Sequence, residues 1–210
     1  MDTLDCITLR RSIRKYKDMP IAFEKIGHIL NAARLAPNAG NIQEWKFIIV
    51  TKEEVRKKIA EICIKQYWMQ DAPVHIVAVS HPAKVANFYG NRGEKVYSMH
   101  SSGAAIENML LAATAQGIGS CWVGAFNESA LKKLLNIPPD AVPQAVITLG
   151  YAAEKPRMPQ KFKTENVMFI ESYGNKVKDI AAYMGYYSEH VQGAIRRGKE
   201  MFKKVLENKK

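Results

Sequence analysis

The chain has 210 residues, 47% of them hydrophobic, and a formal net charge of +11 at pH 7. This length and composition suffice for a buried core and are typical of one large domain. The first five residues are acidic with no apolar signal-peptide core after them, and no apolar run approaches the roughly 20 residues that cross a bilayer. We therefore expect a cytoplasmic protein without a membrane partner.

Cysteine and histidine spacing argues against two kinds of site. The three cysteines are far apart and form no Cys-x-x-Cys pair, so neither a disulfide framework nor a zinc knuckle is expected. The five histidines form no His-x-x-x-His pair, so no metal site is predicted. His75 lies in an apolar run and is expected to be a core histidine.

The positive charge permits nucleic-acid binding without requiring it. It is densest at the C-terminus, where residues 189–206 combine basic and apolar side chains at the spacing of an amphipathic helix. No zinc-finger, helix-turn-helix or RNP pattern accompanies this stretch. A basic nucleic-acid-binding module therefore stays the less favoured alternative.

The first third of the chain predicts helices before the first strand. Residues 2–9 predict a short helix, and residues 22–36 predict a second helix that Pro37 ends. Residues 38–41 have loop composition, and residues 45–51 are rich in aromatic and β-branched residues, which indicates a strand. The apolar positions of the second helix define its inner face: Ile26, Ile29, Leu30 and Ala33.

The next segment predicts a helix, a strand and an irregular insertion. Apolar residues recur at helical spacing over 52–66. Residues 74–80 are apolar at nearly every position, which favours a central strand. Residues 81–94 contain Gly90 and Gly93, and we interpret them as an irregular, mobile segment over a pocket.

The longest helical pattern spans 97–116, with small and apolar residues on all sides, so this helix is expected in the core or at a subunit interface. Strands are predicted at 120–126 and 142–149. Between them Asn127 caps a short helix over 129–136. Helices and strands mixed in this way indicate the α+β class.

The stretch Arg10-Arg11-Ser12-Ile13-Arg14 concentrates three guanidinium groups in five residues. A guanidinium is a planar, permanently charged donor that suits phosphate and carboxylate oxygens. If the backbone is extended, Arg10, Ser12 and Arg14 share one face, while Arg11 and Ile13 point away. Alone, the stretch fits an anion site or a solvated basic patch.

Several common catalytic patterns are missing. Gly117-x-Gly119 lacks the third glycine of a dinucleotide fingerprint and precedes a strand instead of following one. There is no Walker loop and no Gly-x-Ser-x-Gly elbow. Anion-binding groups without an acid–base or nucleophilic set favour a cofactor as the source of the chemistry, and we nominate no catalytic side chain.

Four segments, in order, resemble motifs of the FMN-dependent nitroreductase family. They are Arg10-Arg11-Ser12-Ile13-Arg14-Lys15-Tyr16, Ala36-Pro37-Asn38-Ala39-Gly40-Asn41-Ile42-Gln43-Glu44-Trp45, Gly117-Ile118-Gly119-Ser120-Cys121-Trp122-Val123-Gly124, and Leu149-Gly150-Tyr151-Ala152-Ala153-Glu154-Lys155-Pro156 with the cations that follow. The resemblance spans roughly residues 5 to 173. It implies an α+β fold with a central, mostly antiparallel sheet of about four to five strands, flanking helices, and a long buried helix at the core of a homodimer.

The resemblance also assigns an FMN site. Arg10, Ser12, Lys161 and Lys163 would hold the phosphate and ribityl chain, with Arg11 assisting. Arg14 would lie at the pyrimidine end of the ring, where a positive charge favours the reduced flavin.

The resemblance gives the remaining ring contacts to two other segments. Val123 and Gly124 would pass their backbone near N5. Pro37, Asn38 and Asn41 would come from the partner subunit. Three positions depart from the motifs: Asn38 replaces serine, Glu44 replaces proline, and Ala152 replaces proline.

The sequence thus predicts an NAD(P)H-dependent FMN oxidoreductase that passes electrons from NADH or NADPH to a small acceptor, such as a nitroaromatic, a quinone or a flavin, by a ping-pong mechanism. The FMN-binding domain is expected at 1–176, with a basic helical extension at 177–210. A reductive dehalogenase or a flavin-fragmenting enzyme on the same scaffold is an alternative.

Overall fold

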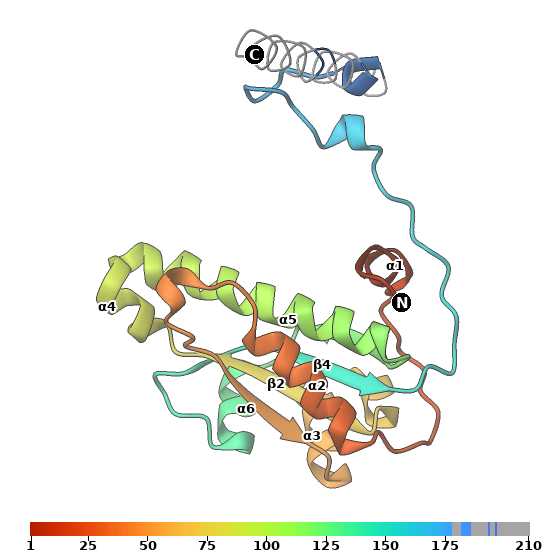
Figure 1. Ribbon diagram of the computed structural model, residues 1–210. Helices are drawn as coiled ribbons and strands as arrows, with labels where there is room; N and C mark the ends of the chain where they lie inside the picture. Colours follow the sequence, from red (N-terminus) through yellow and green to blue (C-terminus); the bar gives the residue numbers. More distant parts are fainter. Residues whose placement is uncertain (178–181, 186–192, 194–195, 197–210) are drawn as a thin grey trace, which may run out of the picture. The chain divides into compact units, whose positions relative to one another are not determined.

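The computed structural model describes residues 1–177, 182–185, 193 and 196. The chain divides into two units, Met1–Met158 and Pro159–Lys210. The first unit holds all four strands of the described chain and its named α-helices (Figure 1). In the second unit, a short 3-10 turn spans Thr164–Asn166, and residues 182–185 are helical. The helix expected at 189–206 lies outside the described residues, except for 193 and 196.

A four-stranded antiparallel sheet forms the centre of the first unit. Its strands are β1 (Lys46–Val50), β2 (Val74–Ser80), β3 (Gly119–Val123) and β4 (Val142–Gly150), in the order β1-β2-β4-β3. Every residue of β2 is buried, because β2 has a neighbour on each side and a layer of helices on each face. The predicted α+β class, antiparallel sheet and central strand are confirmed, whereas β3 ends three residues earlier than expected.

Alternate residues of the strands build two cores. Ile76 and its neighbours face α2 (Phe23–Arg34) and α5 (Ser98–Ala115), while Val77 faces α3 (Glu53–Ile62) and α6 (Glu128–Leu135). Figure 1 shows these helix pairs on opposite faces of the sheet. A period of two along each strand therefore produces a three-layer arrangement.

The helix caps follow the polar residues that precede each helix. Asp2 accepts a hydrogen bond from the Asp5 backbone N–H at 2.8 Å and begins α1 (Thr3–Leu9), and Asn127 accepts one from the Ala130 N–H at 2.9 Å to begin α6. The predicted cap at Asn127 is confirmed. α3 is shorter than predicted because Ile64 and Lys65 adopt left-handed φ values of 57° and 56° directly after it.

The segment expected to be irregular is helical, so that prediction was wrong. α4 spans Pro82–Arg92 and continues through a π-helical turn, Gly93–Tyr97, into α5. Pro82 occupies the first turn, where its missing N–H has no cost. Gly90 does interrupt the helix, with φ 56° and ψ −151°, but Gly93 keeps a helical φ of −59°.

Two absences apply to the described part of the chain. None of its helices is both long enough and apolar enough to cross a membrane. Nor do three or more His, Cys, Asp or Glu side chains gather in it as metal ligands would.

Candidate cofactor site

The arginine stretch is fixed to the sheet by its backbone. The Ile13 N–H donates to the Ser120 carbonyl at 2.9 Å, and Ser12 forms a parallel bridge with Ser120 on β3. Further along, Tyr16 bridges Ala152, just after β4. The stretch therefore leaves α1 and runs as a short extended segment beside β3. An extended backbone is the condition under which its side chains alternate between two faces.

Two polar side chains reinforce this attachment. The buried Tyr16 hydroxyl donates to the Ile13 carbonyl at 2.6 Å, which leaves Thr148 to donate the 2.7 Å bond between the two hydroxyls. Burial raises the pKa of Tyr16, so its hydroxyl stays protonated. The Glu154 carboxylate accepts the backbone N–H groups of Arg14 and Lys15 at 2.6 and 3.0 Å.

The three arginines diverge from one another. Arg10 Nε lies 3.4 Å from the Glu107 carboxylate on α5. Arg11 folds back, and its Nη1 donates to two backbone carbonyls at the C-terminal end of α1, at 2.8 and 2.7 Å. Arg14 is exposed, with its guanidinium 5.8 Å from the centre of the Trp68 ring. Ile13 was expected to point away from the face shared by Arg10 and Arg14, and it is buried.

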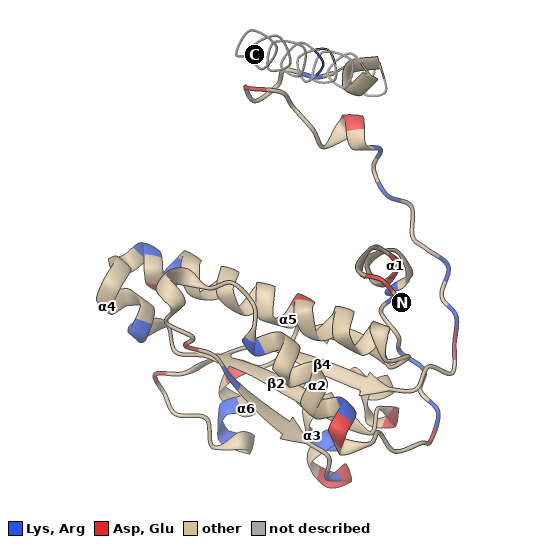
Figure 2. Ribbon diagram, in the orientation of Figure 1, with Lys and Arg blue, Asp and Glu red and all other residues tan. Residues whose placement is uncertain are grey.

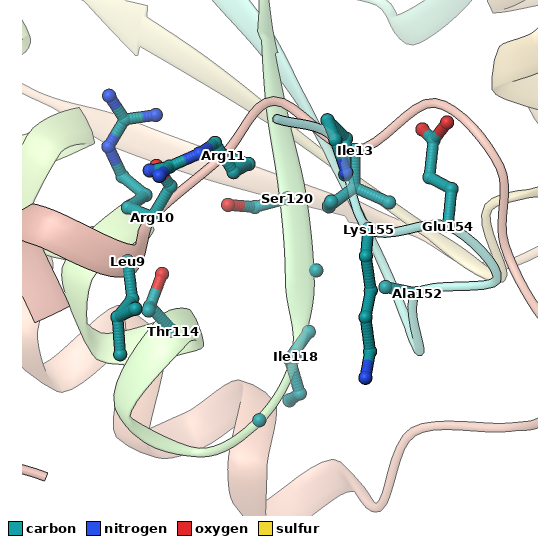
Figure 3. Close-up of a pocket in the computed structure, with 13 residues that line it drawn as sticks. Leu9, Arg10, Arg11, Ile13, Thr114, Ile118, Ser120, Ala152, Glu154 and Lys155 are labelled. Carbon is teal, nitrogen blue, oxygen red and sulfur yellow. The ribbon is translucent and has the colours of Figure 1, made fainter. Parts of the chain in front are cut away.

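A cavity of about 360 Å³ opens beside this stretch (Figure 3). Its walls are the end of α1, the loop Gly117–Gly119, the start of β3, and residues 152–156. Arg10, Arg11 and Lys155 contribute three cations, whereas Glu154 is the one carboxylate among the lining residues and already accepts two backbone N–H groups. The charge balance favours an anionic ligand.

Two lining groups are buried without a hydrogen-bond partner among the described residues: Ser120 Oγ and Arg11 Nε. The Thr114 hydroxyl, also in the wall, already donates to the Leu110 carbonyl at 2.8 Å. Arg11 Nε can only donate, and a serine hydroxyl can donate as well. The cavity thus offers free donors beside positive charge, and a phosphate satisfies both.

Ser12 does not line this cavity. Ser12 lies beside β3, where its hydroxyl and Arg14 lower the pKa of the Cys121 thiol while burial, the larger effect, raises it. The hydroxyl that the sequence placed on the anion-binding face is therefore outside the cavity wall.

The other cofactor positions on β3 lie at its C-terminal end. Val123 is buried and Gly124 is exposed; the nearest atom to a Cβ built on Gly124 is Trp122 Nε1, at 3.9 Å. The backbone is open there to a flat ligand. Four residues separate Ser120 from Gly124, a distance of about 13 Å along an extended strand.

The loop predicted to contact the flavin from the partner is ordered by its own side chains. The side-chain Oδ1 of Asn38 accepts the Gln43 N–H at 3.0 Å, while Gly40 and Asn41 have φ values of 55° and 56°. Pro37 and Asn41 are exposed. The Ala39 N–H donates to Ser101 Oγ at 3.3 Å, which attaches the loop to the first turn of α5.

This loop and the cavity are attached to opposite ends of α5. Ser101 holds the loop, and Thr114 lines the cavity thirteen residues later, which is about 20 Å along a helix. Within one chain, the predicted ring contacts at Asn38 and Asn41 are therefore separated from the cations at Arg10 and Arg11.

Three further positions have different outcomes. Lys161 and Lys163 are exposed residues of the second unit, and their convergence with Arg10 on one phosphate stays a prediction. Glu44, at the position of the motif's proline, is buried, and its Oε1 has no hydrogen-bond partner in the described chain.

The sequence assigned no cofactor role to three cavity residues: Thr114, Ser120 and Lys155. The signal was present in the Gly117-x-Gly119 turn, which does not fit a dinucleotide fingerprint. It forms the cavity wall that leads into Ser120. A Cβ on Gly119 would lie 3.0 Å from Ile13, so glycine permits the close approach of the arginine stretch.

Comparison with known proteins identifies the family. The pattern described as "Nitroreductase family" matches residues 7–68 and 63–151. An FMN reductase [NAD(P)H] of Bacillus subtilis is 30% identical over 219 aligned positions, which cover 95% of this chain and 86% of the relative. The chain belongs to the nitroreductase family.

Solved nitroreductase structures have the same fold. A nitroreductase family protein from Clostridium novyi NT superposes with a TM-score of 0.68 at 28% identity, covering 84% of this chain and 97% of that one. The NADPH:FMN oxidoreductase of Vibrio harveyi, complexed with NAD+, gives a TM-score of 0.75 at 22% identity over 91% and 85% of the two chains. These findings confirm the expected family, fold and enzyme class, an oxidoreductase.

Proposed function

We propose that the protein is an FMN-dependent oxidoreductase that takes electrons from NADH or NADPH and passes them to a small acceptor. The observation that carries this proposal is the cation-lined cavity with free donors, beside the stretch that the family motif assigns to the cofactor. The name of the Bacillus subtilis relative, an FMN reductase [NAD(P)H], supports the same cofactor and donor.

The residues present fit FMN along β3. Arg10, Arg11 and Lys155 would hold the phosphate in the cavity, and Gly124 would leave its backbone open to the ring at the other end of the strand. Arg14 is exposed and would place its charge near the ring. Lys161 and Lys163 are proposed as further phosphate contacts on the strength of the motif.

When bound, FMN supplies the redox chemistry, because it accepts a hydride from the nicotinamide and passes electrons to the acceptor. The described residues that line the cavity include no histidine, and the Glu154 carboxylate is engaged by backbone N–H groups. The side chains of the protein would thus bind and orient the flavin and its substrates, and we propose no side chain as a general acid or base. One open ring face would serve both substrates in turn, so ping-pong kinetics are expected.

The separation along α5 supports a site shared between two subunits. If two α5 helices pack antiparallel about a two-fold axis, the loop at the start of one helix lies beside the cavity at the end of the other. This pairing would bring Pro37, Asn38 and Asn41 of one protomer to the flavin that is held by its partner.

The proposal is tested by the purified full-length protein. We expect a yellow preparation that releases FMN on denaturation, and parallel lines in double-reciprocal plots of NAD(P)H oxidation at several acceptor concentrations. A colourless protein that does not bind added FMN would contradict the proposal. Menadione and nitrofurazone, assayed with each nicotinamide, would then rank acceptors and donors.

A further inference from the structure

We infer that Ser120, and not Ser12, supplies the hydroxyl that binds the flavin phosphate; this inference rests on the proposed function. The two serines are partners in one β-bridge, so their backbones are equally well placed beside the arginine stretch. Their side chains have different surroundings, and that difference decides between them.

Ser120 has a free hydroxyl in the cavity wall. The residue is 2% exposed, and its Oγ is buried without a partner in the described chain. Figure 3 shows this oxygen directed from β3 toward the side where Arg10, Arg11 and Thr114 lie. Ser12, by contrast, is absent from the wall, and its hydroxyl is not among the buried side-chain atoms without a partner.

The surroundings of Ser120 favour a phosphate as its partner. Thr114 has the other hydroxyl in the wall, and this hydroxyl already donates a hydrogen bond to the Leu110 carbonyl. Arg11 Nε is an additional buried donor without a partner, and three cations line the same space. A phosphate monoester brings several acceptor oxygens and a double negative charge, which match both the unpaired donors and the excess of positive charge.

The backbone holds Ser120 in place before any ligand arrives. Its carbonyl accepts the Ile13 N–H, and it pairs with Leu149 in the β3–β4 ladder. The side chain retains only rotation about χ1 and rotation of its hydroxyl hydrogen, so little freedom is lost when the hydroxyl binds. A hydrogen bond from a buried hydroxyl to a charged acceptor is also stronger than one made in water.

The consequence is selectivity for FMN over riboflavin, which has the same ring and ribityl chain without the phosphate. We expect Ser120→Ala to weaken FMN binding by about 10-fold or more, since a hydrogen bond to a charged group is lost. Riboflavin affinity should change by less than about twofold, because no phosphate contact exists to lose.

Both affinities are measured by titrating flavin-stripped, full-length protein and following flavin fluorescence. The matched control is Ser102→Ala, because Ser102 on α5 is also a buried serine with an unpartnered hydroxyl but does not line the cavity. It should preserve the ratio of FMN to riboflavin affinity. At the same concentration, inorganic phosphate should raise the melting temperature of the wild-type chain by more than that of Ser120→Ala.

Other outcomes would overturn the assignment. Equal losses for FMN and riboflavin in Ser120→Ala would indicate a structural role, and loss of selectivity in Ser12→Ala alone would restore Ser12. If Ser120→Ala does not fold, Ser120→Cys retains a similar volume with a weak donor and should show the same loss of selectivity. A wild-type chain that binds no flavin contradicts the proposed function itself, and the assignment with it.

Discussion

His75 lies in the middle of the sheet on β2 and is fully buried. Its Nε2 donates to the Met69 carbonyl at 2.9 Å, while Nδ1 has no partner within the described chain. Burial lowers the pKa of His75 to about 4, although the bond to Met69 acts in the opposite direction. The expectation of a core histidine is therefore confirmed, and it has a consequence for stability.

We predict that stability falls between pH 6.5 and pH 4. The folded protein keeps His75 neutral, whereas the unfolded chain takes up a proton below its ordinary pKa of about 6.5. The stabilisation is complete above that pH and is lost as the pH falls toward 4, at most about 3 kcal/mol.

Urea unfolding of wild type and His75→Gln at pH 4.5, 5.5 and 7 measures this effect. In His75→Gln, the free energy of unfolding should depend much less on pH than in the wild type. His28→Gln, a change at an exposed position of α2, should keep the wild-type dependence. Equal slopes for all three proteins would contradict the role of His75.

Predictions for single residues were correct where the direction of the extended backbone determines the face on which a side chain lies. Alternation along an extended strand correctly placed Ile13 in the core, away from the arginine face. The same rule does not say where a long side chain bends or which residues line a cavity, and so it missed Arg11 folding back onto α1 and the absence of Ser12 from the cavity wall. Which serine faces a cavity depends on contacts between segments more than one hundred residues apart.

At the level of elements, α4 and the loop before β1 are coupled through Gly40. The residue has φ 55°, and a Cβ built on it would lie 2.6 Å from the hydroxyl oxygen of Tyr89. Tyr89 belongs to α4, in the segment that was expected to be irregular. Glycine at this position permits both the left-handed backbone conformation and the close approach of Tyr89 from the neighbouring helix.

We predict that Gly40→Ala destabilises the fold by about 1–3 kcal/mol, through the strained φ and the clash with Tyr89. Tyr89→Phe removes the hydroxyl, so the double variant should be less destabilised than the sum of the two changes. Thermal and urea unfolding of the four proteins gives the coupling. Gly27→Ala, in open space on α2, is the control and should be neutral or stabilising. Strict additivity would argue against the contact.

The error over residues 81–94 has a physical origin. Two glycines three residues apart indicate a loop by propensity, and one of them, Gly90, does break the helix. Gly93 is helical for another reason: a Cβ there would lie 2.7 Å from the Val85 carbonyl, so the turn requires a residue without a side chain. Local propensity cannot distinguish a glycine that breaks a helix from one that lets it pack.

For the whole molecule, the hydrophobic periods were sufficient to predict the four strands and the helices that cover the sheet, but not α4. Their pairing order, β1-β2-β4-β3, depends on long-range packing that no local pattern contains. The same is true of the site. The motifs named Arg10, Asn41 and Gly124, but only the folded chain shows that α5 separates the first two. Figure 2 shows the positions of basic and acidic residues spread over many elements of the first unit, so charge alone would not have located the cavity.

The separation of Arg10 from Asn41 by α5 predicts that two variants, each defective at one of these residues, restore a binding site when they are mixed. Arg10→Ala and Asn41→Ala should each weaken FMN binding as homodimers. If the site is shared, a mixed dimer contains one intact site, because the wild-type Arg10 of one subunit meets the wild-type Asn41 of the other. After unfolding and refolding an equal mixture, roughly a quarter of the sites should bind FMN tightly.

Sedimentation analysis of the same mixture checks that dimers are the species present. Binding no better than that of either variant alone would mean that each chain builds its own site.

The contact between Arg10 and Glu107 bears on the order in which the protein is assembled. Glu107 provides Arg10 with a counter-ion from the chain itself, so the cations at the cavity are partly neutralised before any cofactor arrives. A half-exposed pair of this kind contributes only about 0–1 kcal/mol, so a dianion can displace the carboxylate at small cost. A newly made chain would then fold first and load its cofactor last, by exchanging one negative partner for another.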